Sequence, residues 1–182
     1  AGSVGTWYQL PEMLDFYAAA RERWPGLFFL FLVNRSPEVV ASALEERGVA
    51  ERDHAVVWAR HEEMPAYLSA SDAAIAFIRP SLSKQSSMPT KYGEYLSCGL
   101  PFAATSGVGD VDALLSGSTA GVLVATHSRE AHTSAADRLR ALAESGDRAG
   151  LRAVAEREFS VVSRALPAFR DLYERILRGA AA

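Results

Sequence analysis

The run Leu27–Val33, with the sequence LFFLFLV, is apolar at every position. Continuous apolarity is typical of a strand that is covered on both faces, because a strand with one solvated face alternates apolar and polar residues. We expect further strands at the shorter apolar runs Ala55–Trp58, Ala73–Ile78, Phe102–Thr105 and Gly121–Ala125. Seven residues are too few to cross a bilayer as a helix, so Leu27–Val33 predicts no membrane span.

Helical patterns separate these runs. Apolar residues recur at helical spacing over Leu10–Tyr17, after Ser36-Pro37 and over Met64–Leu68. Beyond Ala125 only helical patterns remain. The last one extends from Val162 to Ile176 and contains Pro167, so this helix either bends at the proline or begins later.

Alternation of apolar strands with helices predicts an α/β fold with a doubly wound, mostly parallel, Rossmann-like sheet. We expect one domain over residues 1–182, with helices on both faces of the sheet. Additional helices should form the carboxyl-terminal part of the chain. The chain opens at what resembles a strand–helix loop, so we expect the first strand to be missing or truncated. Ligands of such folds bind beyond the carboxyl ends of the strands, which here points to the loops Gly2–Thr6, Asn34–Pro37, Arg79–Pro89 and Ser106–Asp110.

Composition narrows the range of partners and cellular settings. The formal net charge is -3 and the sequence pI is about 5.8, which does not favour a nucleic-acid partner. The single cysteine, Cys98, cannot form an intrachain disulfide, so we expect a cytoplasmic protein. His127 and His132 are five residues apart, outside the i, i+4 spacing that suits a metal, and we expect no metal site.

The segment SSMPTKYGEYLSCGLPFAATSGVGD, residues 86–110, carries the strongest chemical signal. Pro89 suits the first position of a helix, and Gly99 suits its left-handed cap. The amino end of that helix would face the ligand edge of the sheet, where free amides and the helix dipole attract phosphate. Four nearby side chains are candidates to bind a diphosphate: Arg79, Lys84, Thr90 and Lys91.

Glu94 lies one helical turn after Lys91, on about the same face of this helix. A carboxylate there can accept hydrogen bonds from two neighbouring hydroxyls, such as those of a ribose. The same spacing also suits an ordinary surface pair of opposite charges, worth only a few tenths of a kcal/mol. The residues alone leave both interpretations open.

PTKYGEYLSCGLPFAATSGVGD resembles the donor-site segment of retaining glycosyltransferases with the GT-B fold, in the family 4 group. Three further segments resemble that group in the same order: GSVGTWYQLPEML, HEEMPAYLSASDAAIAFIRPS, and AEREFS followed by the final helix. The resemblance covers nearly the whole chain. It implies the carboxyl-terminal, nucleotide-sugar-binding half of a two-domain enzyme whose amino-terminal acceptor half is absent.

Individual residues follow from this resemblance. Glu94 matches the second glutamate of the family's E-x7-E pattern, which implies that it binds the donor ribose. The first glutamate of the pattern falls at Ser86, so Ser86 and Ser87 are the candidates for the sugar end. Ser86 can hydrogen-bond a sugar hydroxyl but cannot carry charge. Close backbone approach to the ligand is expected at the following loop residues: Gly2, Gly5, Thr6, Gly107 and Gly109.

The resemblance implies a transferase that uses a nucleotide-diphosphate sugar as substrate, without a cofactor or a metal, and that retains stereochemistry at the transferred sugar. We expect this chain to bind the nucleotide sugar but not to turn over without the acceptor half. Peripheral membrane contact would come only through the full-length enzyme. Two alternatives stay open: a non-catalytic α/β regulatory or interaction domain, and a degenerate transferase half kept as a scaffold.

Overall fold

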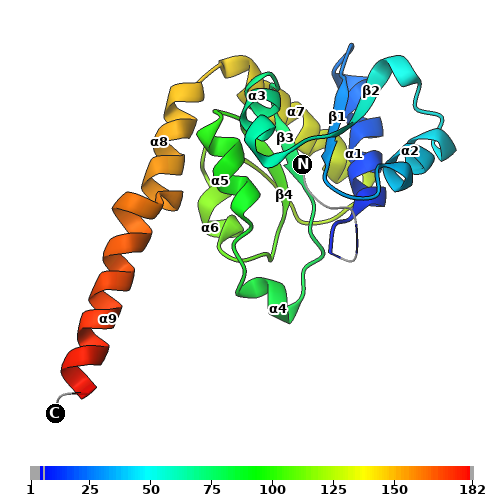
Figure 1. The fold of residues 1–182 in the computed structure, drawn as a ribbon. Helices are drawn as coiled ribbons and strands as arrows, with labels where there is room; N and C mark the ends of the chain where they lie inside the picture. Colours follow the sequence, from blue (N-terminus) through cyan, green and yellow to red (C-terminus); the bar gives the residue numbers. More distant parts are fainter. Residues whose placement is uncertain (1–4, 6, 181–182) are drawn as a thin grey trace.

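The structure is a computed structural model that describes residue 5 and residues 7–180. Its strands are β1 (Phe29–Val33), β2 (His54–Trp58), β3 (Ala74–Ala76), β4 (Phe102–Thr105) and β5 (Gly121–Val124). Its helices are α1 (Leu10–Arg23), α2 (Pro37–Glu46), α3 (Met64–Ser69), α4 (Leu82–Gln85), α5 (Thr90–Ser97), α6 (Val111–Leu115), α7 (Arg129–Ser145), α8 (Arg148–Phe159) and α9 (Leu166–Ala180). Every apolar run of the sequence therefore contains a strand (Figure 1).

All paired strands of the sheet are parallel. β1 pairs with β2, and β4 lies between β3 and β5. Within the described residues, no ladder joins β1 to β3, so the strands form a pair and a group of three. Parallel strands with helical crossovers confirm the Rossmann-like α/β fold that the sequence predicts.

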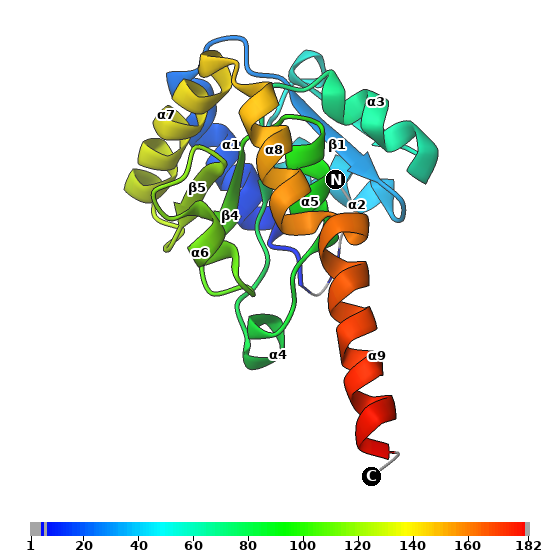
Figure 2. The same cartoon turned by 90° about the vertical axis from the view of Figure 1, so that its left-hand side faces the viewer.

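Helices cover both faces of the strands. On one face, α1 and α7 pack side by side over a buried cluster that includes Phe16, Phe77 and Leu139. On the other face, α5 packs over a larger cluster that includes Tyr92, Leu96 and Phe102, and α8 lies across α5 (Figure 2). This burial on both sides explains why the strands are apolar at successive positions.

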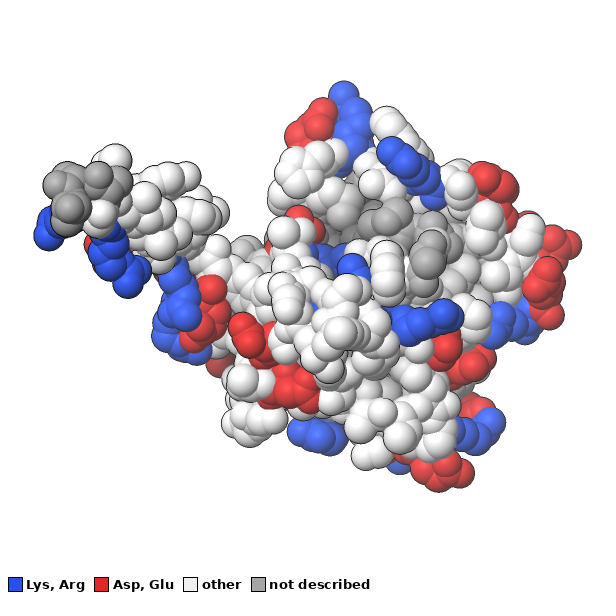
Figure 3. Space-filling view, turned by 90° about the horizontal axis from the view of Figure 1, so that it is seen from below, with Lys and Arg blue, Asp and Glu red and all other residues white. Residues whose placement is uncertain are grey.

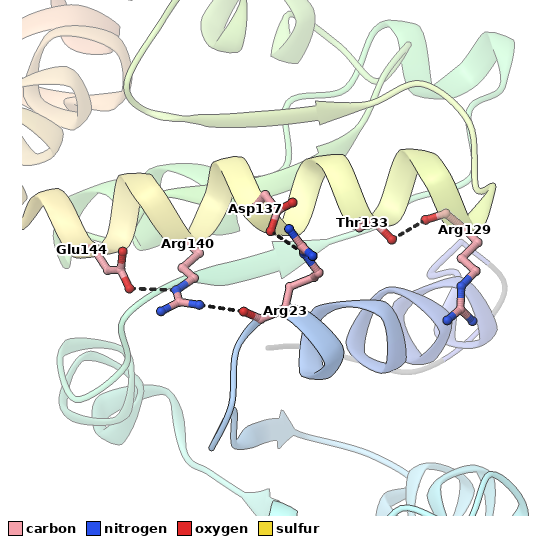
Figure 4. Close-up of polar contacts among 6 residues, drawn as sticks. All are labelled: Arg23, Arg129, Thr133, Asp137, Arg140 and Glu144. Atoms are coloured by element: carbon pink, nitrogen blue, oxygen red, sulfur yellow. Dashed lines mark hydrogen bonds and ion pairs between the residues drawn. The ribbon is translucent and has the colours of Figure 1, made fainter.

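Polar contacts line the seam between α1 and α7 (Figure 4). Arg23 pairs with Asp137 at 2.9 Å, and Arg140 donates to the backbone carbonyl of Arg23 at 2.6 Å while also pairing with Glu144 at 2.7 Å. Exposed pairs of this kind contribute little individually. The bond from Arg140 has a clearer structural role, because it satisfies a carbonyl at the carboxyl end of α1 that no helical amide can reach.

Two prolines lie at the starts of helices, and one of them differs from its predicted position. Pro89 is the residue that precedes α5, not its first residue, because its ψ of 123° is extended. Pro167 is the second residue of α9, and a π-helical turn at Val161–Ala165 comes before it. Of the two possibilities for Pro167, the later start of the helix is therefore the one observed.

Helix α9 extends away from the rest of the molecule (Figures 1 and 2). Its main contacts are with the preceding π-helical turn. Its apolar side chains are consequently exposed by 45–70%: Leu166, Phe169, Leu172, Tyr173, Ile176 and Leu177.

Candidate functional site

A cavity of about 310 Å³ lies at the carboxyl ends of β1 and β2, beside the amino end of α5. The sequence placed the ligand site at this edge of the sheet, from the rule for doubly wound folds. We call this cavity the α5 cleft. It is lined by Tyr8, Leu32, Val33, Asn34, Ala59, His61, Met64, Thr90, Lys91 and Glu94.

The first two turns of α5 supply the charged wall of the α5 cleft. Thr90 is exposed, Glu94 is half-buried, and Lys91 is only 8% exposed. Burial lowers the pKa of the Lys91 ammonium to about 8, and the Glu94 carboxylate opposes that shift. A buried lysine is not half of an ordinary surface pair, so the structure rules out that interpretation of Lys91 and Glu94.

Tyr8 covers Lys91 from the opposite side. The Lys91 Nζ lies 3.8 Å from the centre of the Tyr8 ring, which is a cation–π contact. Burial and the Glu94 carboxylate both raise the pKa of the Tyr8 hydroxyl, so Tyr8 stays a neutral hydrogen-bond donor at physiological pH. The cleft thus brings together an ammonium, a carboxylate and a phenol, and the sequence pointed to the first two.

Backbone bonds place Tyr8 here. The Gln9 amide donates to the Phe77 carbonyl at 3.0 Å, and the Arg79 amide donates to the Trp7 carbonyl at 2.8 Å. Tyr8 and Ile78 form an antiparallel bridge between these two bonds. The segment before α1 therefore crosses the carboxyl end of β3, a long-range contact that residue patterns do not reveal.

The opposite wall of the α5 cleft comes from two loops that follow strands. Asn34 follows β1, whereas Ala59 and His61 follow β2, and Met64 begins α3. The sequence identified the Asn34–Pro37 loop as part of the ligand edge, whereas it gave His61 no role. Asn34, Ala59 and His61 share one feature in the sequence, because each follows shortly after an apolar strand.

Arg79 and Lys84 do not line the α5 cleft. Arg79 is exposed just after β3, and the Lys84 Nζ lies 4.5 Å from the centre of the Trp7 ring. Figure 3 shows the molecule from below the view of Figure 1. On this face, basic and acidic side chains are interspersed. Of the four candidate diphosphate ligands, the structure brings Thr90 and Lys91 to the cleft and leaves the other two outside it.

Ser86 and Ser87 lie away from the α5 cleft, in the loop between α4 and α5. Ser86 is exposed, and the Ser87 hydroxyl donates to the Lys84 carbonyl at 3.0 Å. The Gly109 amide donates to that same carbonyl at 2.9 Å, with a φ of +54°. A Cβ on Gly109 would lie 2.0 Å from the Ser87 carbonyl oxygen, so this glycine allows the two loops to touch.

Gly107 belongs to the same loop contact. Its amide donates to the Asp112 carboxylate at 2.7 Å, and the Ser106 hydroxyl donates to the other oxygen of that carboxylate. The sequence predicts Asp110 as the side-chain cap of α6. Asp110 does precede α6, but its side chain makes no capping bond, and Asp112 organises the loop instead.

The amino-terminal loop is described only in part. Gly2 and Thr6 lie outside the described residues. Gly5 is exposed, and its carbonyl accepts a bond from the Tyr8 amide at 3.0 Å.

The spacing of His127 and His132 in the sequence predicts no metal site. In the structure, His127 Nδ1 and His132 Nε2 lie 3.0 Å apart, because His127 precedes α7 and folds back over it. Both rings contact Phe77, and burial lowers the pKa of each imidazole. Within residues 5 and 7–180, no group of three or more His, Cys, Asp or Glu side chains is arranged to hold a metal ion.

A family model described as "Glycosyl transferases group 1" matches residues 16–142, which is more than half of the chain. The chain belongs to this family. The match includes β1 to β5 and all of α5, so it covers the elements that build most of the α5 cleft. It supports glycosyl transfer as the general activity of this family member.

A search of the curated proteins gave no match to the chain. Among the helices that the structure describes, each is too short or too polar to cross a membrane.

Proposed function

We propose that the chain is the carboxyl-terminal, donor-binding domain of a retaining GT-B glycosyltransferase of the family 4 group. Its ligand would be a nucleotide-diphosphate sugar in the α5 cleft. The observation that carries this proposal is the placement of Lys91 and Glu94 in one cavity, one turn apart on a helix whose amino end faces that cavity.

Lys91 and Thr90 are the proposed diphosphate ligands. An ammonium that is 8% exposed loses much of its hydration, so a bound anion restores favourable interactions that solvent supplies only weakly. The amides of the first turn of α5 add partial positive charge in the same place. Together these groups would stabilise the departing diphosphate without a metal ion.

Glu94 is the proposed ribose ligand. It lies one turn farther along α5 and lines the same cavity, so a ligand whose diphosphate is at Lys91 brings its pentose within reach. The cavity also has apolar walls from Leu32, Ala59 and Met64, which suit the flat face of a base. Because Ser86 lies outside the cavity, we assign no ligand for the transferred sugar.

Transfer itself requires an acceptor site, which we place on a separate amino-terminal domain. The isolated chain is therefore proposed to bind donor without turning it over. The proposal assigns no catalytic residue to this chain.

Isothermal titration with a panel of uridine, guanosine and adenosine diphosphate sugars tests donor binding. We expect one base to be preferred, and we expect Glu94→Gln to weaken binding about tenfold, or roughly 1.4 kcal/mol, through loss of charged hydrogen bonds to the ribose. Glu38→Gln, on the exposed first turn of α2, is the matched control and should bind like the parent. Absence of binding to every donor, or equal affinity of Glu94→Gln and the parent, would overturn the proposal.

A further inference from the structure

The chain has only two lysines among its 19 Lys and Arg residues, and both lie in the connection between β3 and β4. Each ammonium faces an aromatic ring. The Lys91 Nζ lies 3.8 Å from the centre of the Tyr8 ring, and the Lys84 Nζ lies 4.5 Å from the centre of the Trp7 ring. Because Trp7 and Tyr8 are consecutive residues, one short segment contacts both lysines.

The two lysines lie on different sides of that segment. Tyr8 and Lys91 line the α5 cleft, whereas Trp7 and Lys84 do not. Tyr8 is extended, since it forms an antiparallel bridge with Ile78, and successive side chains of an extended chain point to opposite sides. Lys84 therefore provides a second cationic position, next to the α5 cleft but outside it.

Two loops at the ligand edge fix the backbone of Lys84. Its carbonyl accepts bonds from the Ser87 amide at 3.2 Å, the Ser87 hydroxyl at 3.0 Å and the Gly109 amide at 2.9 Å. Helix α4, which carries Lys84, projects beyond the strands at this edge (Figure 1). The Lys84 side chain is half-buried and already ordered against Trp7, which reduces the entropy that it loses when it binds a ligand.

Arg79 adds a second positive charge at this position. Its amide donates to the Trp7 carbonyl at 2.8 Å, so its backbone lies beside the residue that Lys84 contacts. Within the described part of the chain, neither Arg79 nor Lys84 forms an ion pair with a carboxylate. The Asp112 carboxylate, in the adjacent loop, already accepts two bonds from its own loop. The positive charge of Arg79 and Lys84 is therefore available to a ligand.

We propose that Arg79 and Lys84, beside Trp7, form a second anion subsite, which binds a carboxylate or phosphate that a substrate carries in addition to the donor diphosphate. Since the diphosphate is assigned to Lys91, this subsite rests on the proposed function. A lysine ammonium is a compact point charge and a guanidinium is a planar fork, and both suit these oxyanions.

Two sources of the second oxyanion fit the subsite. One is the carboxylate of an acidic donor sugar, and the other is a phosphate on the acceptor. Ser86, two residues after Lys84, is neutral and does not repel either group. A neutral sugar passing to a neutral acceptor would leave both cations without a matching charge.

Nuclear magnetic resonance of carbon-13 lysine tests the subsite, because the chain gives only two lysine Cε signals. Lys84→Arg and Lys91→Arg assign them. Each lysine lies over an aromatic ring, so an anion that draws the ammonium away from the ring shifts its signal. Glucose 1-phosphate and glucuronic acid 1-phosphate are the donor probes, since they differ by one carboxylate and carry no base. Hexyl phosphate, added to the chain saturated with glucose 1-phosphate, is the acceptor probe.

We expect the Lys84 signal to shift and saturate either with glucuronic acid 1-phosphate and not with glucose 1-phosphate, or with hexyl phosphate. The first result identifies the donor sugar as the source of the oxyanion, and the second identifies the acceptor. Arg79→Gln should weaken the binding seen at Lys84 about fivefold, as expected for the loss of one exposed charge. Arg152→Gln, on the exposed side of α8, is the matched control and should bind like the parent.

A Lys84 signal that stays in place with glucuronic acid 1-phosphate and with hexyl phosphate, at constant ionic strength, overturns the subsite. Equal binding by Arg79→Gln and the parent also overturns it. The Lys91 signal reports separately on the α5 cleft. A shift at Lys84 without one at Lys91 would therefore contradict the proposed donor site and not the second subsite.

Discussion

Lys91 combines a buried position with a charge that remains largely present at neutral pH. Burial lowers its pKa to about 8, from an ordinary value of 10.5. The Tyr8 ring at 3.8 Å and the nearby Glu94 carboxylate offset part of the cost of that burial. In the folded protein this lysine is therefore destabilising in its charged form and suited to a ligand that brings negative charge.

The pH dependence of stability tests this state of Lys91. Between about pH 8 and 10.5 the unfolded chain keeps a proton that the folded chain has lost, so the free energy of unfolding should rise with pH across that window. Lys91→Met should flatten the rise and should stabilise the protein at pH 7 by about 2 kcal/mol. Urea unfolding at pH 7 and pH 9.5 measures both effects.

Lys84→Met is the control for this measurement, because Lys84 lies outside the α5 cleft. It should keep the difference in stability that the parent shows between the two pH values. An identical pH dependence in the parent and in Lys91→Met would contradict a lowered pKa of Lys91 in the folded protein.

At the residue scale, sequence reasoning reached the side chains that sit on one continuous helix. Thr90, Lys91 and Glu94 follow from helical spacing and from the rule that places ligands at the carboxyl edge. Tyr8 and His61 could not be predicted in this way. Their positions depend on how distant segments meet, and periodicity carries no information about such contacts.

Among the elements, α5 is held against α8 at Gly93, where the Phe159 side chain packs on the helix backbone. A Cβ on Gly93 would lie 2.9 Å from the Phe159 ring of α8, so α5 and α8 pack with no room for a larger residue. The result is a helix whose binding face is set by packing on its opposite side. The sequence showed the glycine but not the partner that requires it.

Two loops at the ligand edge form a second tightly packed pair, and Gly109 tests it. Gly109→Ala adds both strain at a φ of +54° and a clash with the Ser87 carbonyl, so we expect a loss of about 3 kcal/mol, or roughly 6–12 °C in Tm. Gly117→Ala is the matched control. Its φ is +67° with nothing within 4 Å of the added Cβ, so it should cost only about 1 kcal/mol.

Thermal unfolding followed by circular dichroism measures both variants. Equal losses would mean that backbone strain alone explains the effect and that the loops do not constrain each other. A loss in Gly109→Ala that is clearly the larger would confirm the loop contact as the cause.

Sequence patterns located the strands well and the helix ends less well. Four strands lie within their apolar runs and β2 begins one residue earlier, at His54, because burial on both faces leaves a direct mark on composition. Pro89 and Pro167 were harder to place, since proline is compatible with several positions around the start of a helix. Backbone conformation, not residue type, decides among these positions.

For the whole molecule, the division of the strands into a pair and a group of three is a feature that the sequence patterns do not reveal. The cavity of about 320 Å³ between β1 and β3 is likewise a property of the assembled fold. The same holds for α9. Its periodic apolar residues predicted a helix, and the structure shows that these residues are exposed on it.

Removing α9 tests how far it contributes to the stability of the domain. A chain that ends at Ala165 should keep its Tm within about 1 °C, because the deleted side chains are mostly exposed and contact little beyond the preceding turn. Phe159→Ala is the contrasting variant and should lower Tm by several degrees, since Phe159 packs against the larger buried cluster. A drop on truncation as large as that of Phe159→Ala would contradict this account of α9.

Because α9 extends away from the domain, a small rotation at its base gives a larger displacement at its far end. Its fifteen residues span about 22 Å at 1.5 Å per residue, and a π-helical turn joins it to α8, which packs on α5. A rotation of α8 by about 10° would move the far tip by about 4 Å if the helix stayed rigid. A fluorophore or spin label near Arg178 would therefore move farther than residues beside the α5 cleft. Its displacement would make small rotations of α8 measurable.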